Sequence, residues 1–539
     1  GRNRNRSRRG CWTCRSPQVK KRCDEQRPVC GNCSRRKLYC DYSPRPTLAE
    51  RRRAEAAILR NSADSPISGI PNAVIARMQS PSLSVTRIAT PSVGASSLTL
   101  TNEDHEAIRF FRTAFASTHH TKNPDYSMFS IMFTLAQDDP MVMHMVVSIG
   151  LREMDLRRTA PATSQRNPLT HYASALRLMA DAISPENVAP DLDSIYTAIW
   201  LMLFYEQRFG DAECKAYSKH LDGASSLLQH RGRQLLQLPS PSCGLGEKEK
   251  APVLFRRSGT SDSRLSIYAA RILIWISLLD SAAASFGCGG QVNGTIYSLL
   301  VGEEESHART LSPVEAFGRL HRFSNPLYRM TWGDNYPQTE LLDDVENRNI
   351  YALLGQCAQL RFMVAQLSNL YRIDAQSAIQ KARDVDASIQ QVGYLFAELL
   401  EVASELSPAT DNSHRLVANI RAIVPVYHAV VLDFMRATTF EQPLAARQRH
   451  AMREIMNLAY QSFKHDGDEA MIRVAWPLFM VALETDDLLH RDWILDRFTT
   501  MKKFGYNFER ADRFLRRAIP EQQQLNKRID VRARLESGE

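Results

Sequence analysis

The sequence predicts a mostly all-α protein in two parts, with a small cysteine-rich module at the N-terminus and a large α-helical domain joined by a disordered linker. Six of the ten cysteines fall between Cys11 and Cys40. Residues 62–100 are rich in serine and proline without sustained periodicity, which is typical of a linker. From Thr101 onward, apolar residues recur at helical spacing and strand-like alternation is scarce. We therefore place the parts at residues 1–45, 46–100, 101–520 and 521–539, the last being a polar tail.

The charge of the chain is distributed unevenly. Residues 1–60 hold 18 lysines and arginines against 5 acidic residues, whereas the rest of the chain holds 50 against 54. A basic head on a near-neutral body is the electrostatic footprint of a segment that contacts phosphates. The overall 44% apolar and 24% charged residues are near the globular average, which argues against wholesale disorder.

Membrane or secretory features are not expected. The apolar stretches 195–205 and 267–286 are either too short to span a bilayer or interrupted by Arg271 and Asp280, so they predict buried helices. The first residues are arginine-rich and lack an apolar signal stretch. We expect an intracellular protein with no membrane partner.

The six clustered cysteines have the spacing C-x2-C-x8-C-x6-C-x2-C-x6-C. A C-x2-C step at the start of a helical turn places two sulfurs on one side, where they can bind one tetrahedral ion. The two halves, residues 11–23 and 30–40, each show such a pair followed by a basic stretch and a third cysteine. The spacing predicts that the metal ligands are Cys11, Cys14, Cys23, Cys30, Cys33 and Cys40.

Six thiolates cannot fill two separate four-sulfur sites, but they can if two of the sulfurs bridge both ions. Each of two Zn2+ then receives four sulfurs, and the cluster keeps an excess of negative charge. Nearby cations favour the metallated state and remain available to phosphates. These cations are Arg15, Lys20, Lys21, Arg22, Arg27, Arg35, Arg36 and Lys37.

The cysteine pattern has three other, less favoured interpretations. A three-disulfide module needs an oxidising compartment, and a redox C-x2-C pair needs a βαβ context; the sequence shows neither. A zinc knot with a purely structural role is the third. The four remaining cysteines, which lie singly at Cys214, Cys243, Cys288 and Cys357, are interpreted as ordinary buried or partly buried residues.

Residues 10–42, GCWTCRSPQVKKRCDEQRPVCGNCSRRKLYCDY, resemble the Zn2Cys6 binuclear cluster module of fungal transcription factors. The resemblance implies that Cys11 and Cys30 bridge two zinc ions, that Cys14 and Cys23 complete one, and that Cys33 and Cys40 complete the other. It implies a short helix that reads a CGG-like triplet of double-stranded DNA in the major groove, where Lys or Arg pairs with guanine. The candidate DNA-binding residues are Arg15, Lys20, Lys21 and Arg22.

The resemblance further implies a nuclear regulator of RNA polymerase II transcription that contacts transcriptional co-regulators. Members often follow the cluster with a linker and a dimerising coiled coil, so a homodimer is one expectation. Residues 46–61 can form a helix, but their apolar residues do not complete two clean heptads.

The spacing departs from the family pattern between Cys14 and Cys23, where eight residues replace the usual six. Pro17 and Gln18 stand where basic residues are usual, and proline fits only the first turn of a helix. One hypothesis is a longer loop that still closes the cluster; the other is a splice-boundary error in the gene model. The alternative function is a helical protein-interaction regulator with a degenerate cluster that no longer reads DNA.

The body from 101 to 520 predicts about fifteen or more helices, with loops near 233–262 and 287–313. Two apolar stripes at helical spacing predict core faces: Tyr172, Leu176, Met179 and Ile183, and then Leu360, Met363, Leu367 and Leu370. The segments 193–211, 219–232 and 475–495 resemble the helical regulatory domain that follows the cluster in fungal transcription factors.

No catalytic site is expected. His490-Arg491-Asp492 imitates a kinase catalytic loop, but Arg497 stands where a metal-binding Asn is needed. His119 and His120 lack Glu or Cys partners at ligand spacing, and Gly287–Gly290 lacks the Lys-Ser/Thr of a phosphate loop. A zinc enzyme is disfavoured because closing the cluster uses every cysteine of the head.

Overall fold

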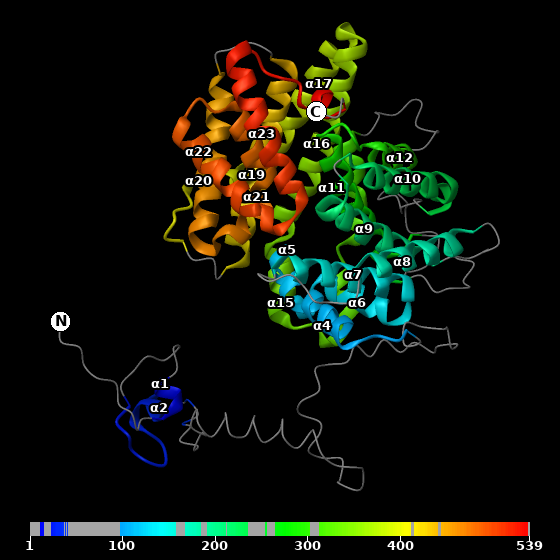
Figure 1. Ribbon diagram of the computed structural model, residues 1–539. Coiled ribbons are helices and arrows are strands. Elements are labelled where there is room, and N and C mark those ends of the chain that lie inside the picture. The colour runs from blue at the N-terminus through cyan, green and yellow to red at the C-terminus, as the bar shows by residue number, and fades with distance from the viewer. Residues whose placement is uncertain are drawn as a thin grey trace, which may run out of the picture. The chain divides into compact units, whose positions relative to one another are not determined.

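A computed structural model describes residues 11–15, 23–36, 38, 40, 98–157, 168–184, 191–211, 213–235, 254–255, 265–301, 312–410, 414–439 and 444–536 (Figure 1). Every regular element in these ranges is helical, as the sequence predicts. The chain divides into two compact units, residues 1–86 and 87–539. The predicted helix at 46–61 and most of the predicted linker lie outside the described residues.

The described residues of the first unit form two short helices, α1 (Trp12–Arg15) and α2 (Gly31–Arg35). The second unit begins with α4 (Asn102–Phe110), the π-helical turn η3 (Phe111–Phe115), α5 (Ala116–His119) and the 3-10 turn η4 (Pro124–Tyr126). It continues with α6 (Met128–Asp138), α7 (Pro140–Arg157), α8 (Pro168–Ile183), α9 (Leu192–Phe209), α10 (Lys215–Leu235), α11 (Ile267–Ala284) and α12 (Gln291–Val301).

The second half of this unit contains α13 (Pro313–Ser324), α14 (Leu327–Trp332), η5 (Gly333–Asn335), α15 (Gln338–Glu346), α16 (Arg348–Ile373), α17 (Ala375–Leu395) and α18 (Ala397–Glu405). It ends with α19 (Arg415–Thr438), α20 (Ala446–Asp466), α21 (Asp468–Glu484), α22 (Leu488–Met501), η6 (Lys502–Phe504), α23 (Tyr506–Leu525) and α24 (Val531–Glu536).

Helix starts follow local capping rules. The Thr101 hydroxyl accepts from the Asp104 N–H while the Asp104 carboxylate accepts from the Thr101 N–H, which closes a capping box at the start of α4. Ser312 and Glu315 form the same box at α13, where Pro313 occupies the first turn. These side chains satisfy backbone donors that have no partner inside the helix.

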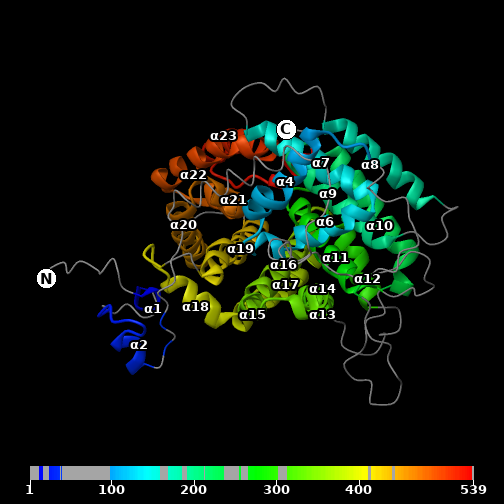
Figure 2. The ribbon, with the colours of Figure 1, turned by 90° about the horizontal axis from the view of Figure 1, so that it is seen from below.

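The middle of the helical domain is held by α16, which packs against α11 on one side and α19 on the other. Figure 2 shows α16 between these helices, and both views place α20 and α22 beyond α19 and α10 and α12 beyond α11 (Figures 1 and 2). One large apolar cluster spans the half of the domain from α16 to α24. The burial of long helices on several sides therefore accounts for the stability of this domain.

Two helices, α11 and α19, are long and apolar enough to cross a bilayer by composition alone. Both are core helices, because 72% and 83% of their most apolar windows are buried inside the domain. Helix α9 is enclosed as well, and of its residues only Gln207 is not buried. The prediction that the apolar stretches at 195–205 and 267–286 form buried helices is confirmed.

The two predicted apolar stripes have different outcomes. On α16, Leu360, Met363 and Leu367 are buried and Leu370 is half-buried against the same core, as predicted. On α8, Tyr172 is buried, but Leu176 and Ile183 are exposed. The α8 prediction is therefore wrong for these two residues, because the helix packs on α7 and α9 along one side only.

The predicted loop at 287–313 is also wrong in its middle, where α12 forms. The buried Asp280 carboxylate accepts from the Gly290 N–H at 2.8 Å and from the Asn293 N–H at 2.8 Å. The Asn293 amide group also donates to Asp280, at 2.7 Å. A carboxylate on α11 thus satisfies the first turn of α12, and this long-range contact leaves no local sequence signal.

The polar tail that we expected over residues 521–539 is in part packed structure, although residues 523–527 are exposed. Helix α23 runs through position 520 to Leu525, and Ile529 and Val531 belong to the core. Arg532 is buried and donates to Asp433 on α19 at 2.8 Å. The apolar and charged partners of this segment lie on helices far away in sequence, so composition alone misassigned it.

Several histidines of this domain are half-buried or, at His428, buried, which favours their neutral form. Burial lowers the pKa of His119, His144, His220 and His321 to about 4, and that of His428 to about 3. The unfolded chain binds protons at these groups near pH 6.5. Between pH 6.5 and 4 unfolding therefore takes up protons, so the stability is complete above pH 6.5 and is lost as the pH falls through this window.

We expect His428→Phe to flatten this pH dependence. Removing one such histidine should reduce the slope of unfolding free energy against pH by about 1.4 kcal/mol per pH unit between roughly pH 5.5 and 4.5. Urea unfolding followed by circular dichroism at several pH values measures the slope. His230→Phe is the control because His230 is exposed; equal slopes for both variants would contradict the account.

Candidate metal centre and nucleic-acid interface

The six N-terminal cysteines lie together in the first unit. Cys11, Cys14, Cys23, Cys30 and Cys33 are buried and Cys40 packs against them half-buried, and within the described part of this unit they make up the buried apolar cluster. Two short helices position them: Cys14 lies in α1, Cys33 lies in α2, and Cys30 is the N-cap of α2. The internal repeat seen in the sequence is therefore a repeat of structure.

The sulfur atoms form two overlapping sets of four. One set contains Cys11, Cys14, Cys23 and Cys30, the other contains Cys11, Cys30, Cys33 and Cys40, and within each set all sulfurs lie within 4.8 Å of one another. Cys11 and Cys30, which share both sets, have sulfurs 3.7 Å apart. Four sulfurs about 2.3 Å from a tetrahedral zinc are roughly 3.8 Å apart. The donor set and its spacing fit two zinc ions that share two ligands.

Backbone N–H groups surround the sulfurs. The N–H of Cys14 donates to the Cys11 sulfur at 3.4 Å, the N–H of Cys33 donates to the Cys30 sulfur at 3.4 Å, and the N–H of Cys30 donates to the Cys40 sulfur at 3.3 Å. The N–H of Glu25 donates to the Cys23 sulfur at 3.4 Å. Such donors stabilise negative charge on sulfur, which is the form that binds a metal.

The thiols have unequal proton affinities. Burial raises the pKa of Cys11 far above its usual range and raises that of Cys33 to about 12. Burial acts in the same direction at Cys30, but hydrogen bonds from the Cys33 N–H and from neighbouring thiols outweigh it and lower the pKa to about 6. These thiols would bind a divalent cation as thiolates, because a thiol that coordinates such an ion is deprotonated.

Two polar residues that we did not single out complete the surroundings of the cysteines. The Asn32 side-chain amide donates to the Cys14 sulfur at 3.1 Å and so joins the two helices. The Asp24 carboxylate accepts from the Gly31 N–H at 2.9 Å. A Cβ at Gly31 would lie 2.6 Å from the Asp24 carboxylate, so a larger residue there would displace that side chain. Both contacts depend on how the halves fold together, which the cysteine spacing alone does not give.

We expect Asn32→Ala to weaken zinc binding by roughly tenfold or more, because groups that hydrogen-bond metal ligands typically contribute that much to metal affinity. Competition with a coloured zinc chelator measures the change. Ser34→Ala on the same helix is the control, since Ser34 is exposed. Equal zinc affinities for the two variants would show that the Asn32 contact does not support the cluster.

The predicted DNA-contact residues are described only in part. Arg15 ends α1, directly after Cys14. Lys20, Lys21 and Arg22 lie outside the described residues, as do Pro17 and Gln18. Of the other cations expected near the cluster, Arg27, Arg35 and Arg36 are exposed.

The other candidate residues from the sequence, the histidines and the single cysteines, do not form a catalytic arrangement among the described residues. His119 lies beside the buried Glu153 at 3.6 Å, and His120 stacks between Trp275 and Tyr351, so both are core histidines. His490 is in the first turn of α22, 3.6 Å from the capping residue Asp487. Of the other cysteines, Cys357 is buried and Cys214 and Cys288 are half-buried.

Comparison with known families agrees with this architecture. The model of the fungal specific transcription factor domain matches residues 108–518, most of the helical unit. The model of the fungal Zn(2)-Cys(6) binuclear cluster domain matches residues 9–49, which contain all six clustered cysteines. The chain therefore belongs to the fungal specific transcription factor family, and its N-terminal domain is of a kind that binds zinc.

The similar curated proteins are all regulators of transcription or uptake, and they align with a small part of the chain. The chain is 58% identical over 41 residues to sterol uptake control protein 2 of Candida albicans and 60% identical over 37 residues to transcriptional regulatory protein UME6 of Saccharomyces cerevisiae. An uncharacterized transcriptional regulatory protein of Schizosaccharomyces pombe is 36% identical over 74 residues. The matches span 6% of the Candida albicans protein, 4% of the Saccharomyces cerevisiae protein and 13% of the Schizosaccharomyces pombe protein. No solved structure matches the chain.

Proposed function

We propose that this protein is a zinc-dependent, sequence-specific DNA-binding regulator of RNA polymerase II transcription that acts in the nucleus. Cys11, Cys14, Cys23, Cys30, Cys33 and Cys40 hold two Zn2+, with Cys11 and Cys30 bridging. The observation that carries the proposal is the pair of interlocking four-sulfur sets that share these two residues. In this function zinc is structural: it holds the two halves in one geometry and presents the basic segment after Cys14.

Arg15, Lys20, Lys21 and Arg22 contact double-stranded DNA. A lysine or arginine that faces guanine O6 and N7 supplies specificity for a CGG-like triplet, while neighbouring cations bind phosphates and fix the register. The helical domain carries regulation and contacts co-regulators, and a homodimer would pair two such heads. The excess of 18 basic over 5 acidic residues in positions 1–60 supports the DNA partner.

Fluorescence anisotropy with a CGG-containing duplex tests this function. We expect the full chain to bind it more tightly than a scrambled duplex, and a zinc chelator to abolish the preference. Affinity should fall steeply with salt, with a log–log slope of about −3 to −4 per head if four cations contact phosphates. Binding that is unchanged after chelation would refute the mechanism.

The eight residues between Cys14 and Cys23 favour one competing function, a helical interaction regulator whose cluster no longer reads DNA. A variant lacking Pro17 and Gln18, which restores the family spacing, separates the two. Comparable affinity of both forms for the CGG duplex supports a functional longer loop. DNA binding by the shortened form alone would favour the interaction regulator.

A further inference from the structure

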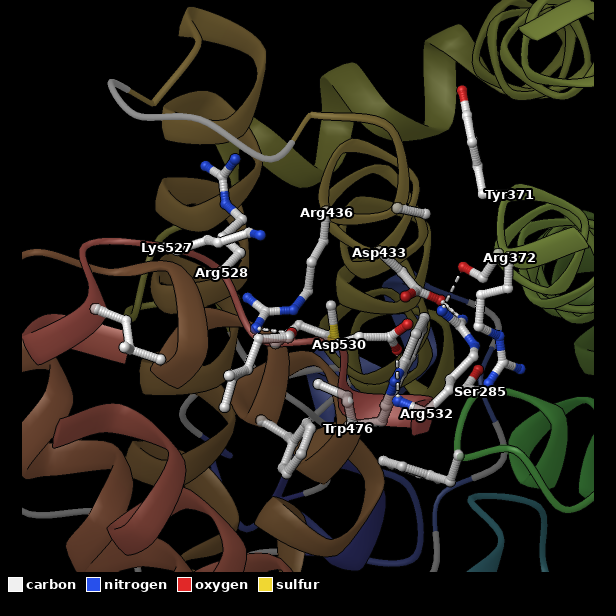
Figure 3. Close-up of a pocket in the computed structure, with 18 residues that line it drawn as sticks. Ser285, Tyr371, Arg372, Asp433, Arg436, Trp476, Lys527, Arg528, Asp530 and Arg532 are labelled. Carbon is white, nitrogen blue, oxygen red and sulfur yellow. Dashed lines mark hydrogen bonds and ion pairs between the residues drawn. The ribbon is translucent and has the colours of Figure 1, made fainter. Parts of the chain in front are cut away.

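A cavity of about 410 Å³ lies in the helical domain (Figure 3). Its walls come from the end of α11, from α16, α19 and α21, and from the segment between α23 and α24 that the sequence had assigned to a polar tail. A volume of this size is within the usual range for small-molecule sites. The cavity is unrelated to the cysteine cluster, which belongs to the other compact unit.

The charge around the cavity is predominantly positive. Two acidic residues line it, Asp433 and Asp530, against five cations: Arg372, Arg436, Lys527, Arg528 and Arg532. A third carboxylate, Glu484, lies behind the wall and binds Arg436 at 2.5 Å and Arg528 at 2.9 Å. Counting this carboxylate, cations remain in excess, and a concave site with low-dielectric walls concentrates that field.

The cations are held in place by the fold. Arg532 donates to Asp433 at 2.8 Å and to the Ser368 hydroxyl at 2.9 Å. Arg436 donates to the Ile529 carbonyl at 2.7 Å, which ties α19 to the C-terminal segment. Figure 3 shows Arg372, Arg436 and Arg532 reaching the cavity from different elements, with Trp476 below them. A ligand would therefore meet Arg436 and Arg532 in positions that the fold already fixes, which lowers the entropic cost of binding.

Beside Ser285, Ser368 and Tyr371, the uncharged lining is apolar and partly aromatic: Phe286, Ala437, Trp476, Phe479, Met480, Leu525, Ile529 and Val531. The Arg361 guanidinium lies 3.6 Å from the Trp476 ring centroid and adds another positive charge near this wall. Inorganic anions would leave the apolar walls without a partner, and neutral hydrocarbons would leave the positive charge uncompensated.

We propose that this cavity binds a small amphipathic organic anion, with a carboxylate or sulfonate near the arginines and an aromatic or aliphatic body against Trp476, Phe479 and Met480. Such a ligand touches α19, α21 and the C-terminal segment at once. Its binding therefore stabilises the docking of this segment, and the site goes beyond the DNA-binding function proposed above.

Isothermal titration calorimetry on the full chain tests the proposal with two probes, 2-naphthoate and octanoate, and their neutral amides. We expect at least one acid to bind saturably with one site per chain and at least tenfold more tightly than its amide. Higher salt should weaken that binding. Failure of both acids to bind, or equal affinity of acids and amides, would overturn the proposal.

Variants locate the site. Arg372 and Lys527 are exposed at the rim, so their double replacement by alanine should leave the fold intact and weaken acid binding at least tenfold. Ala437→Phe fills the cavity without removing any charge and should abolish binding. Lys464→Ala is the control, because Lys464 is an exposed lysine of α20 outside the cavity. If the double variant, folded by circular dichroism, binds as tightly as the control, the proposal fails, whether or not Ala437→Phe folds.

Discussion

Replacement of Cys30 with serine should remove essentially all stoichiometric zinc and abolish specific DNA binding. The Cys30 sulfur belongs to both four-sulfur sets, so the substitution takes a ligand from each ion at once. Binding of structural zinc supplies roughly 10 kcal/mol or more of folding free energy in small zinc domains. Among the described residues of the first unit, the buried apolar cluster consists of the cysteines themselves. Zinc content by mass spectrometry and anisotropy with the CGG duplex measure the two losses.

Two further variants serve as comparisons for Cys30→Ser. Cys40→Ser removes a ligand from one set only, so about one zinc per chain should remain. Cys214→Ser, which changes a half-buried cysteine of the helical unit, should retain the wild-type zinc content. A Cys30→Ser protein with as much zinc as the Cys214→Ser protein would show that Cys30 is not a shared ligand.

The second large effect is expected at Glu484, where α21 ends. Its side chain is 1% exposed and binds Arg436 at 2.5 Å and Arg528 at 2.9 Å. Glu484→Ala would leave two buried guanidinium groups without their carboxylate, and breaking a buried ion pair in this way typically costs about 3–5 kcal/mol. Chemical unfolding of the helical domain should show a loss of this size.

Asp386→Ala provides the matched control for Glu484→Ala. Asp386 also binds an arginine, Arg447, at 2.6 Å, but both side chains are about one-third exposed. Pairs open to solvent contribute roughly 0–1 kcal/mol, so the control should lose no more than that. Similar losses for the two variants would mean that the ion pairs of Glu484 with Arg436 and Arg528 do not hold the C-terminal segment in place.

The features that the sequence predicted correctly are those with local signals. The cysteine spacing grouped the six residues that the structure brings together, and the apolar content of 195–205 indicated the buried helix α9. The core face of α16 at Leu360, Met363 and Leu367 follows from spacing along a single helix. These signals operate within one turn or one helix, so they survive without knowledge of the tertiary fold.

The features that the sequence missed depend on partners far away along the chain. The Asp280 carboxylate on α11 accepts a hydrogen bond from the first turn of α12. The carboxylate of Glu484 likewise binds arginines that are 48 and 44 positions away in the sequence. Periodicity could not show that α8 would leave Leu176 exposed, because that depends on which neighbours cover the helix. For the same reason the cavity, which is lined by five separate segments, could not be predicted from the sequence.

X-ray absorption at the zinc edge of the purified full chain tests the central claim most directly. If six cysteines hold two ions, every zinc should have four sulfur neighbours at about 2.3 Å and a second zinc nearby. A first shell containing nitrogen or oxygen, or isolated zinc ions without a zinc neighbour, would contradict the shared-sulfur cluster on which the proposed DNA recognition depends.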